Sequence, residues 1–381
     1  MSKKWYVCSG KSTHFLVKTP QKSALHHGTI LWSIMVESLA IERFLALARE
    51  TGAPILDVRT PAEYDRAHLP DAHNLPLFTN EERVIVGTAY KQQGREAAIM
   101  LGLDMVGVKM RSLVEAAERI NAASAFASSK TLLVHCWRGG MRSGSVAWLL
   151  DLVGYKVFTL RGGYKAYRRL ALDTIEKPRE IRILGGKTGS GKTAILQALQ
   201  ARGEQILDLE ALAHHKGSAF GALGEEPPPT QEEFENRIGT ALWEMDASRR
   251  VWIEDESRMV GRLMIPAPLW EQMRVAKTLI VEVPTVERVR YLTEIYGEFT
   301  NDELTESVLR IQKRLGGAAT KEALAALDVG DMARCAEVTL GYYDSTYTRG
   351  LKRRDPKTIC QLDAPSIAAN IIAERIVQMD L

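Results

Sequence analysis

The residues best suited to chemistry lie around one cysteine, in the segment His135-Cys-Trp-Arg-Gly-Gly-Met-Arg-Ser143. An apolar stretch, Thr131–His135, precedes the cysteine and an apolar helical pattern follows it, which predicts a loop between a strand and a helix. Backbone N–H groups in such a loop can point inward, bind an anion and lower the pKa of a thiol. The segment therefore predicts that Cys136 is a nucleophile, the alternative being a buried structural cysteine beside a glycine turn.

Four further residues of this loop have predicted roles. Gly139 and Gly140 would provide turns with positive φ and backbone amides for a phosphate. Arg142 would hold an oxyanion with two parallel hydrogen bonds, and Arg138 is a second candidate catalytic residue. Five residues separate Cys136 from Arg142. This wide spacing suits a ligand larger than a single sulfur atom.

A second segment, Gly186-Lys-Thr-Gly-Ser-Gly-Lys-Thr193, fits the G-x-x-x-x-G-K-[ST] phosphate-binding pattern in full. It follows a predicted strand and opens a predicted helix, which is the context the pattern requires. Backbone amides of the loop would surround phosphate oxygens, the lysine would add a point charge, and the threonine hydroxyl would bind Mg²⁺. The predicted phosphate-binding residues are Gly186, Gly189, Ser190, Gly191, Lys192 and Thr193.

Acidic residues downstream are candidates for the metal. Asp255 follows the apolar strand Val251–Ile253, and with Glu254 or Glu256 it would hold Mg²⁺ or its waters. Acids solvated at a strand end are the alternative. A further polar segment, 208–221, has no definite role from its spacing.

The elements that must position these residues alternate between strand and helix, which predicts an α/β fold with parallel sheets. We expect three regions: a disordered N-terminal extension over 1–34, a first domain over 35–176, and a second over 177–381 with a helical C-terminal part. Apolar residues make up 45% and charged residues 25% of the 381 residues, as in ordinary globular proteins. No apolar run approaches the ~20 residues that a membrane span needs. Four scattered cysteines suggest neither disulfides nor zinc and fit a reducing cytoplasm.

The net charge of +3 does not by itself indicate a nucleic-acid partner. Two basic clusters, 161–169 and 349–354, could contact phosphates, or could be solvated faces. The candidates for contact with nucleic-acid phosphates are Arg161, Lys165, Arg168, Arg169, Arg353 and Arg354.

The first domain resembles the rhodanese family over roughly residues 36–170. The resemblance is carried by the cysteine loop and by Asp57-Val-Arg-Thr-Pro-Ala-Glu-Tyr64 followed by His68–Pro76. The cysteine loop is longer than in plain sulfurtransferases and looks like that of the phosphatase relatives of rhodanese. A rhodanese-like parallel-sheet domain followed by a P-loop NTPase-like α/β domain is therefore expected.

The combination over residues ~36–350 resembles the tRNA 2-selenouridine synthase family. Besides the two loops, the matching segments are Val86–Gly94, Gly162–Lys165, Asp208–Glu210, Gly217–Gly221, Phe234–Asn236 and Glu254–Arg258. The resemblance implies a cytoplasmic transferase that modifies the wobble uridine of certain tRNAs. In the first step the sulfur of a 2-thiouridine is alkylated by geranyl diphosphate. In the second step selenium from selenophosphate replaces the geranylthio group.

This resemblance assigns the residues as follows. The Gly186–Thr193 loop and Mg²⁺, with Asp255, would bind the diphosphate of geranyl diphosphate. Cys136 would accept selenium as a perselenide or otherwise orient selenophosphate, while Arg142 holds the phosphate. The expected partners are tRNA with a wobble 2-thiouridine and the two donors, with selenophosphate synthetase as a further candidate and no membrane.

Two alternatives stay open at this stage. The chain could be an HC-x5-R phosphatase fused to a nucleotide kinase, since His135, Cys136 and Arg142 satisfy that spacing. It could also be a P-loop regulatory ATPase whose rhodanese domain only binds partners. The sequence leaves the pocket for the geranyl chain unplaced.

Overall fold

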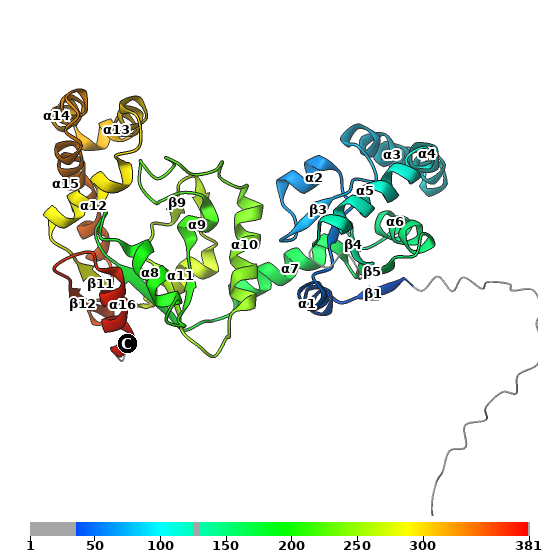
Figure 1. Ribbon diagram of the computed structural model, residues 1–381, viewed down its shortest axis with the longest axis horizontal. Coiled ribbons are helices and arrows are strands. Elements are labelled where there is room, and N and C mark those ends of the chain that lie inside the picture. Colours follow the sequence, from blue (N-terminus) through cyan, green and yellow to red (C-terminus); the bar gives the residue numbers. More distant parts are fainter. Residues whose placement is uncertain (1–35, 125–129, 380–381) are drawn as a thin grey trace, which may run out of the picture. The chain divides into compact units, whose positions relative to one another are not determined.

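The computed structural model describes residues 36–124 and 130–379. The extension predicted over 1–34 lies outside these residues. Two five-stranded sheets, each parallel throughout, are covered by helices (Figure 1). This arrangement confirms the predicted α/β class.

The first sheet has the strand order β1-β5-β4-β2-β3. Its strands are β1 (Glu37–Leu39), β2 (Ile55–Asp57), β3 (Ala72–Asn74), β4 (Thr131–His135) and β5 (Lys156–Leu160). The helices around it are α1 (Ile41–Thr51), α2 (Pro61–Arg66), α3 (Asn80–Gln92), α4 (Arg95–Gly107), α5 (Met110–Ala123), α6 (Met141–Leu152) and α7 (Gly163–Glu176). Successive side chains of a strand point to opposite faces, so neighbours enter different cores. Leu56, Leu132 and Val134 pack on one face, and Ile55 and Leu133 pack on the other.

The second sheet has the order β12-β11-β6-β8-β7. Its strands are β6 (Ile181–Gly185), β7 (Gln205–Leu207), β8 (Val251–Glu254), β11 (Lys277–Glu282) and β12 (Ile359–Asp363). The helices of this part are α8 (Lys192–Gln200), α9 (Leu209–Ala213), α10 (Gln231–Glu244), α11 (Ala267–Val275) and α16 (Ala369–Gln378). The same alternation sends Ile183 and Ile253 to one core and Leu184 and Trp252 to the other. A hairpin of β9 (Met259–Val260) and β10 (Leu263–Met264) follows β8.

The predicted helical C-terminal part comprises four helices inserted between β11 and β12 (Figure 1). They are α12 (Thr285–Tyr296), α13 (Asn301–Leu315), α14 (Gly317–Asp328) and α15 (Met332–Leu351), and the short 3-10 helix η2 (Pro356–Thr358) precedes β12. A core that includes Leu304, Val308 and Leu327 holds them together. Across the described residues, no helix combines the length and apolarity that crossing a membrane requires.

Candidate active sites

The cysteine loop leaves the carboxyl end of β4 and enters α6 at Met141. Cys136 is 3% exposed, and its Sγ lies 3.3 Å from the Ser143 hydroxyl. Burial raises the pKa of the thiol, but hydrogen bonds from the Ser143 side chain and from the N–H groups of Gly140, Arg138 and Ser143 outweigh it. The net pKa lies below its ordinary value, so the geometry stabilises a thiolate.

The shape of the cysteine loop requires glycine at positions 139 and 163, because a side chain at either position would collide with backbone atoms. Gly139 has a φ of 63°, and a Cβ there would lie 2.3 Å from the carbonyl oxygen of Leu160. Gly163 at the start of α7 has a φ of 60°, and its Cβ would lie 2.2 Å from the carbonyl oxygen of Cys136. The positive φ predicted for Gly139 is confirmed, whereas the one predicted for Gly140 is wrong, since its φ is −115°. Gly140 contributes its N–H group instead.

Helix α7 anchors the loop from the other side. The N–H of Tyr164 donates to the Cys136 carbonyl at 2.8 Å, and the N–H of Lys165 donates to that of Trp137 at 3.1 Å. The Tyr164 ring stacks on Trp137 and lies 4.0 Å from the guanidinium carbon of Arg59, which forms a buried ion pair with Asp57. This explains why the Asp57 motif and the Gly162–Lys165 segment accompany the loop.

The two arginines of the loop differ in their surroundings. Arg142 donates two hydrogen bonds to Glu63 of α2, at 2.7 and 3.3 Å, so a carboxylate takes the position predicted for an oxyanion. The Arg138 side chain is exposed, and the residue reaches the thiol through its backbone N–H. Their catalytic roles stay predictions.

The second loop lies between β6 and α8, with Gly189 and Gly191 at φ values of 79° and 75°. At Gly191 a Cβ would lie 2.4 Å from Ile367. The loop is held by the C-terminal helices: the Tyr347 hydroxyl accepts a hydrogen bond from the Gly186 N–H, and Arg288 donates to the Thr188 carbonyl. The buried Ser190 hydroxyl has no hydrogen-bond partner among the described residues.

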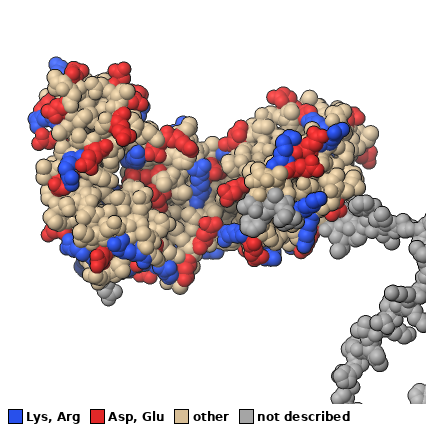
Figure 2. Space-filling model, in the orientation of Figure 1, with Lys and Arg blue, Asp and Glu red and all other residues tan. Residues whose placement is uncertain are grey.

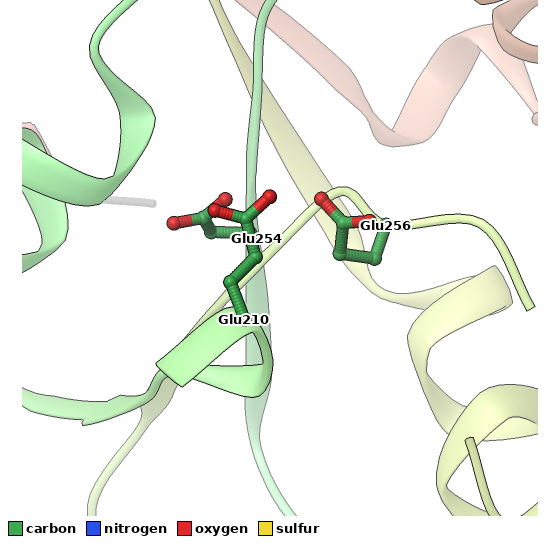
Figure 3. Close-up of side chains that lie close together, drawn as sticks. All are labelled: Glu210, Glu254 and Glu256. Atoms are coloured by element: carbon green, nitrogen blue, oxygen red, sulfur yellow. The ribbon is translucent and has the colours of Figure 1, made fainter. Parts of the chain in front are cut away.

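Three carboxylates converge beside this loop (Figure 3). Glu210 comes from α9, Glu254 from the end of β8 and Glu256 from the segment after it, with one oxygen of each within 4.8 Å of the others. Burial and neighbouring carboxylates raise the pKa of both Glu210 and Glu254 to about 8, and burial raises that of Glu256 to about 7.

The surroundings of this trio favour a cation. Both side-chain oxygens of Glu254 are buried and have no hydrogen-bond partner in the described part of the chain. The Thr193 hydroxyl donates to Glu210 at 3.2 Å. Burial disfavours the ammonium of Lys192, but Glu254, Glu256, Glu210 and Asp255 outweigh it and raise the pKa of Lys192. Oxygen ligands of this kind fit Mg²⁺.

Asp255, the predicted metal partner, is turned away from this trio. Its carboxylate accepts hydrogen bonds from Arg354 at 2.5 Å and from the Tyr347 hydroxyl at 3.2 Å. Asp255 therefore ties the end of β8 to α15, and its place as a metal ligand is not supported by this packing. Glu254 and Glu256, either of which was predicted to hold the metal together with Asp255, both lie in the trio.

A cavity of about 910 Å³ opens over the phosphate loop and the trio. Its polar lining includes Lys192, Thr193, Lys216, Arg258 and Arg353. Its apolar and aromatic lining includes Trp270, Tyr291, Leu292, Ile295 and Leu351. One cavity thus offers both a charged end and an apolar wall.

The predicted tRNA contacts separate into exposed and engaged residues. Side chains of Arg161, Lys165, Arg169 and Arg353 are exposed. Arg168 is paired with Glu235 and Asn236 of α10, and Arg354 is buried against Asp255 and the Met273 carbonyl. The prediction for Arg354 is contradicted by its burial, and Arg168 is not free for a phosphate. Acidic and basic side chains are interspersed over the face shown in Figure 2.

Several residues of these sites were not singled out from the sequence. Ser143 and Glu63 act on the cysteine loop, while Arg288 and Tyr347 support the phosphate loop. Ser143 lies in the cysteine segment and Glu63 in the Asp57–Tyr64 motif, so the sequence contained a signal for both. Arg288 and Tyr347 are distant in the chain from the phosphate loop that they hold, so residue spacing gave no signal for them.

Comparison with known proteins covers both halves of the chain. Residues 179–376 match the family model described as the tRNA 2-selenouridine synthase AAA domain, and residues 41–170 match the rhodanese-like domain. Three relatives carry the name tRNA 2-selenouridine synthase. The protein from Shewanella loihica is 38% identical over 70% of this chain and 75% of its own length. Those from Marinobacter nauticus and Shewanella sediminis are 37% and 35% identical, over 69% and 81% of this chain and 76% and 90% of their own lengths.

The matches span both loops, the carboxylate trio and the helices that hold the phosphate loop, and they reach from the first sheet to the last helix. On this evidence the chain belongs to the tRNA 2-selenouridine synthase family.

Proposed function

We propose that this protein is a tRNA-modifying transferase that converts a wobble 2-thiouridine into 2-selenouridine through a geranylated intermediate. The relatives' names support the outcome, selenouridine in tRNA. The observation that carries the intermediate is the cavity over the phosphate loop, where cationic and carboxylate groups share one space with an apolar wall. That combination suits a prenyl diphosphate.

In the first step the thiocarbonyl sulfur attacks C1 of geranyl diphosphate. The new S–C bond forms as the C1–O bond breaks, and pyrophosphate leaves with the electron pair. Lys192 and the loop amides hold the departing diphosphate, and the wall near Trp270 and Leu292 excludes water from C1. Glu210, Glu254, Glu256 and Thr193 would hold Mg²⁺, which adds charge neutralisation when bound.

In the second step selenium replaces the geranylthio group at C2 of the uracil ring. The selenium of selenophosphate attacks C2, geranylthiolate leaves, and water cleaves the remaining Se–P bond to release phosphate. The N–H groups around Cys136 hold the phosphate end, and the thiolate orients the selenium. Transfer through a Cys136 perselenide would instead expel phosphite, because the thiolate would attack selenium itself. Phosphorus NMR of the products distinguishes the two routes.

Assays with each donor alone test the division of labour. Lys192→Ala should lower the rate of geranylation by about a hundredfold or more, since a charge-stabilising group is lost. Lys277→Ala removes an exposed lysine outside the cavity and is its control. Full geranylation by Lys192→Ala contradicts the assignment. Tight ATP binding with turnover would favour the regulatory ATPase.

The cysteine is tested separately. Cys136→Ala should accumulate geranylated tRNA and form no selenouridine, as measured by mass spectrometry of tRNA nucleosides. Cys360→Ala, outside both sites, is the control. Normal selenation by Cys136→Ala would reject its role. Release of phosphate from a generic aryl phosphate would favour the phosphatase alternative.

A further inference from the structure

A second cavity lies next to the cysteine loop, between α3, α4 and the first turn of α6; we name it the α3–α4 groove. Its volume is about 650 Å³, within the ~300–1,000 Å³ of small-molecule pockets. Val84, Tyr90, Leu103 and Met141 line it and are 58–67% exposed. A cavity of this size with a largely apolar lining is a candidate binding site.

The residues with which α4 lines the groove lie on one side of that helix. The lining residues of α4 are Arg95, Ala98, Ile99, Gly102, Leu103 and Val106. Their spacing of three and four residues places them on one side of the helix. Yet α4 buries only Ala98 and α3 only Ala89. Val86 and Val106 pack partly against the first core, and the other apolar side chains of this paired helix surface (Figure 1) stay largely exposed.

The groove is also positively charged. Arg83, Lys91, Arg95 and Arg142 line it, and no Asp or Glu does. In the described part of the chain only Arg142 of these four pairs with a carboxylate, Glu63. Apolar walls with unpaired cations select an apolar chain attached to an anion. The N-terminal segment 1–34 has five lysines and no acidic residue, so its charge does not match.

The groove reaches the site of the proposed second step. The first turn of α6 places Ser143 against the Cys136 thiol and presents Met141, Arg142 and Ser145 to the groove. Arg83 lines both the groove and a smaller cavity that contains Trp137 and Glu63. The groove and the thiol thus share the first turn of α6, which contacts both.

We propose that the α3–α4 groove binds the prenyl chain of the alkylated tRNA during selenation, with its cations contacting the neighbouring RNA phosphates. This inference rests on the proposed function, because that function supplies the alkylated intermediate. The groove holds the geranylthio group while the selenium nucleophile reaches C2. The same contacts keep the intermediate from being released before selenation.

Binding of synthetic anticodon stem-loops to the full-length protein tests the groove without any turnover. One RNA carries S-geranyl-2-thiouridine and the other S-methyl-2-thiouridine at the wobble position. The wild-type protein should bind the geranyl RNA about tenfold or more tightly, because only the longer chain fills the groove. Equal affinities would overturn the proposal.

A filling variant and a matched control locate the effect. A Cβ at Gly102 would meet only Phe78, at the ordinary contact distance of 3.5 Å, so Gly102→Leu adds a side chain to the groove lining. This variant should lose most of the geranyl preference. Gly107→Leu adds the same side chain to the same helix in open space and should keep it. A preference untouched by Gly102→Leu overturns the proposal.

Salt dependence tests the contact between the groove cations and RNA phosphates. Arg95→Ala should weaken binding of both RNAs equally and reduce the slope of affinity against salt by about one, as expected when one phosphate contact is lost. A loss confined to the geranyl RNA, with an unchanged salt slope, contradicts contact with phosphates.

Further outcomes distinguish a failure of this proposal from a failure of the proposed function. If the wild-type protein forms no geranylated tRNA from geranyl diphosphate, the proposed function fails, whatever the binding preference. If Gly102→Leu abolishes geranylation but keeps the RNA preference, the groove holds the donor and the inference is wrong. A dimer that Gly102→Leu separates in sedimentation assigns the groove to a second copy and also overturns it.

Discussion

Single residues in the two sites control charge in opposite ways. Around Cys136, N–H groups and the Ser143 hydroxyl favour the charged form of the thiol despite its burial. Around Glu254, burial and like charges disfavour the carboxylates, and Lys192 is the compensating cation. The first site is prepared for an anion and the second for additional positive charge.

Ser143→Ala should raise the pKa of Cys136 toward its ordinary value of 9.0, because the Ser143 side chain is the largest contribution that lowers it. A lowered pKa keeps the thiolate to lower pH, and the thiolate is lost as pH falls through that pKa. The variant should therefore lose its thiolate and its proposed selenation at a higher pH than the wild type. Thiolate ultraviolet absorbance, with Cys136→Ala as the blank, measures the shift, and an unchanged midpoint contradicts it.

Glu254→Gln should lower Mg²⁺ affinity by about 10–100-fold. Losing a residue that only supports a metal ligand already costs this much, so the loss of a ligand itself should cost at least as much. Without Mg²⁺ the variant should be more stable than the wild type above about pH 8, because there the buried Glu254 carboxylate is charged and the amide is not. Thermal unfolding with and without Mg²⁺ measures both effects. The exposed Glu374→Gln is the control. Equal stabilisation by Mg²⁺ in wild type and Glu254→Gln would count against a metal at the trio.

At the scale of elements, each loop is held by a helix that is distant along the chain. The start of α7 supports the cysteine loop through Gly163 and Tyr164. Helices α12 and α15 support the phosphate loop through Arg288 and Tyr347. Loop geometry therefore depends on how these helices pack, as well as on the motif residues.

Gly163→Ala should distort the cysteine loop, because the new Cβ would meet the Cys136 carbonyl oxygen at 2.2 Å and the Gly139 nitrogen at 2.5 Å. We expect a loss of about 1–3 kcal/mol in stability and a loss of selenation with geranylation retained. Gly154→Ala shares the positive φ but has open space around its Cβ, so it isolates the backbone strain. Urea unfolding and the two single-donor assays measure the outcome. If Gly154→Ala impairs selenation equally, the steric account is wrong.

At the scale of the whole molecule, helix α7 connects the two sheets by packing against α10. The Tyr164 hydroxyl donates to Glu232 at 2.7 Å and accepts from Asn236 at 2.9 Å. Because the Tyr164 N–H also donates to the Cys136 carbonyl, Tyr164 links the cysteine loop to α10 of the second half. The fully buried Asn236 lies at the centre of this network.

Asn236→Ala should destabilise the protein by about 1–3 kcal/mol, since Tyr164 and Arg168 each lose a buried hydrogen-bond partner. We also expect unfolding of the two halves to separate into distinct transitions, because the network joins them. Calorimetry and urea denaturation are the measurements. The exposed Asn370→Ala is the control. Wild-type stability in Asn236→Ala would show that the network contributes little.

The sequence by itself determined the α/β class, the two loops and the family. Strand alternation and the glycine, cysteine and lysine spacings are local properties, and Cys136, Lys192 and Gly139 lie as those spacings predict. Only the tertiary structure decided which charges meet. It paired Asp255 with Arg354, brought Glu210 to Glu254, and paired Arg142 with Glu63. Such pairs join residues far apart in the chain, and their geometry follows from helix and sheet packing rather than from local pattern. The α3–α4 groove likewise exists only because α3 and α4 pack beside the first turn of α6.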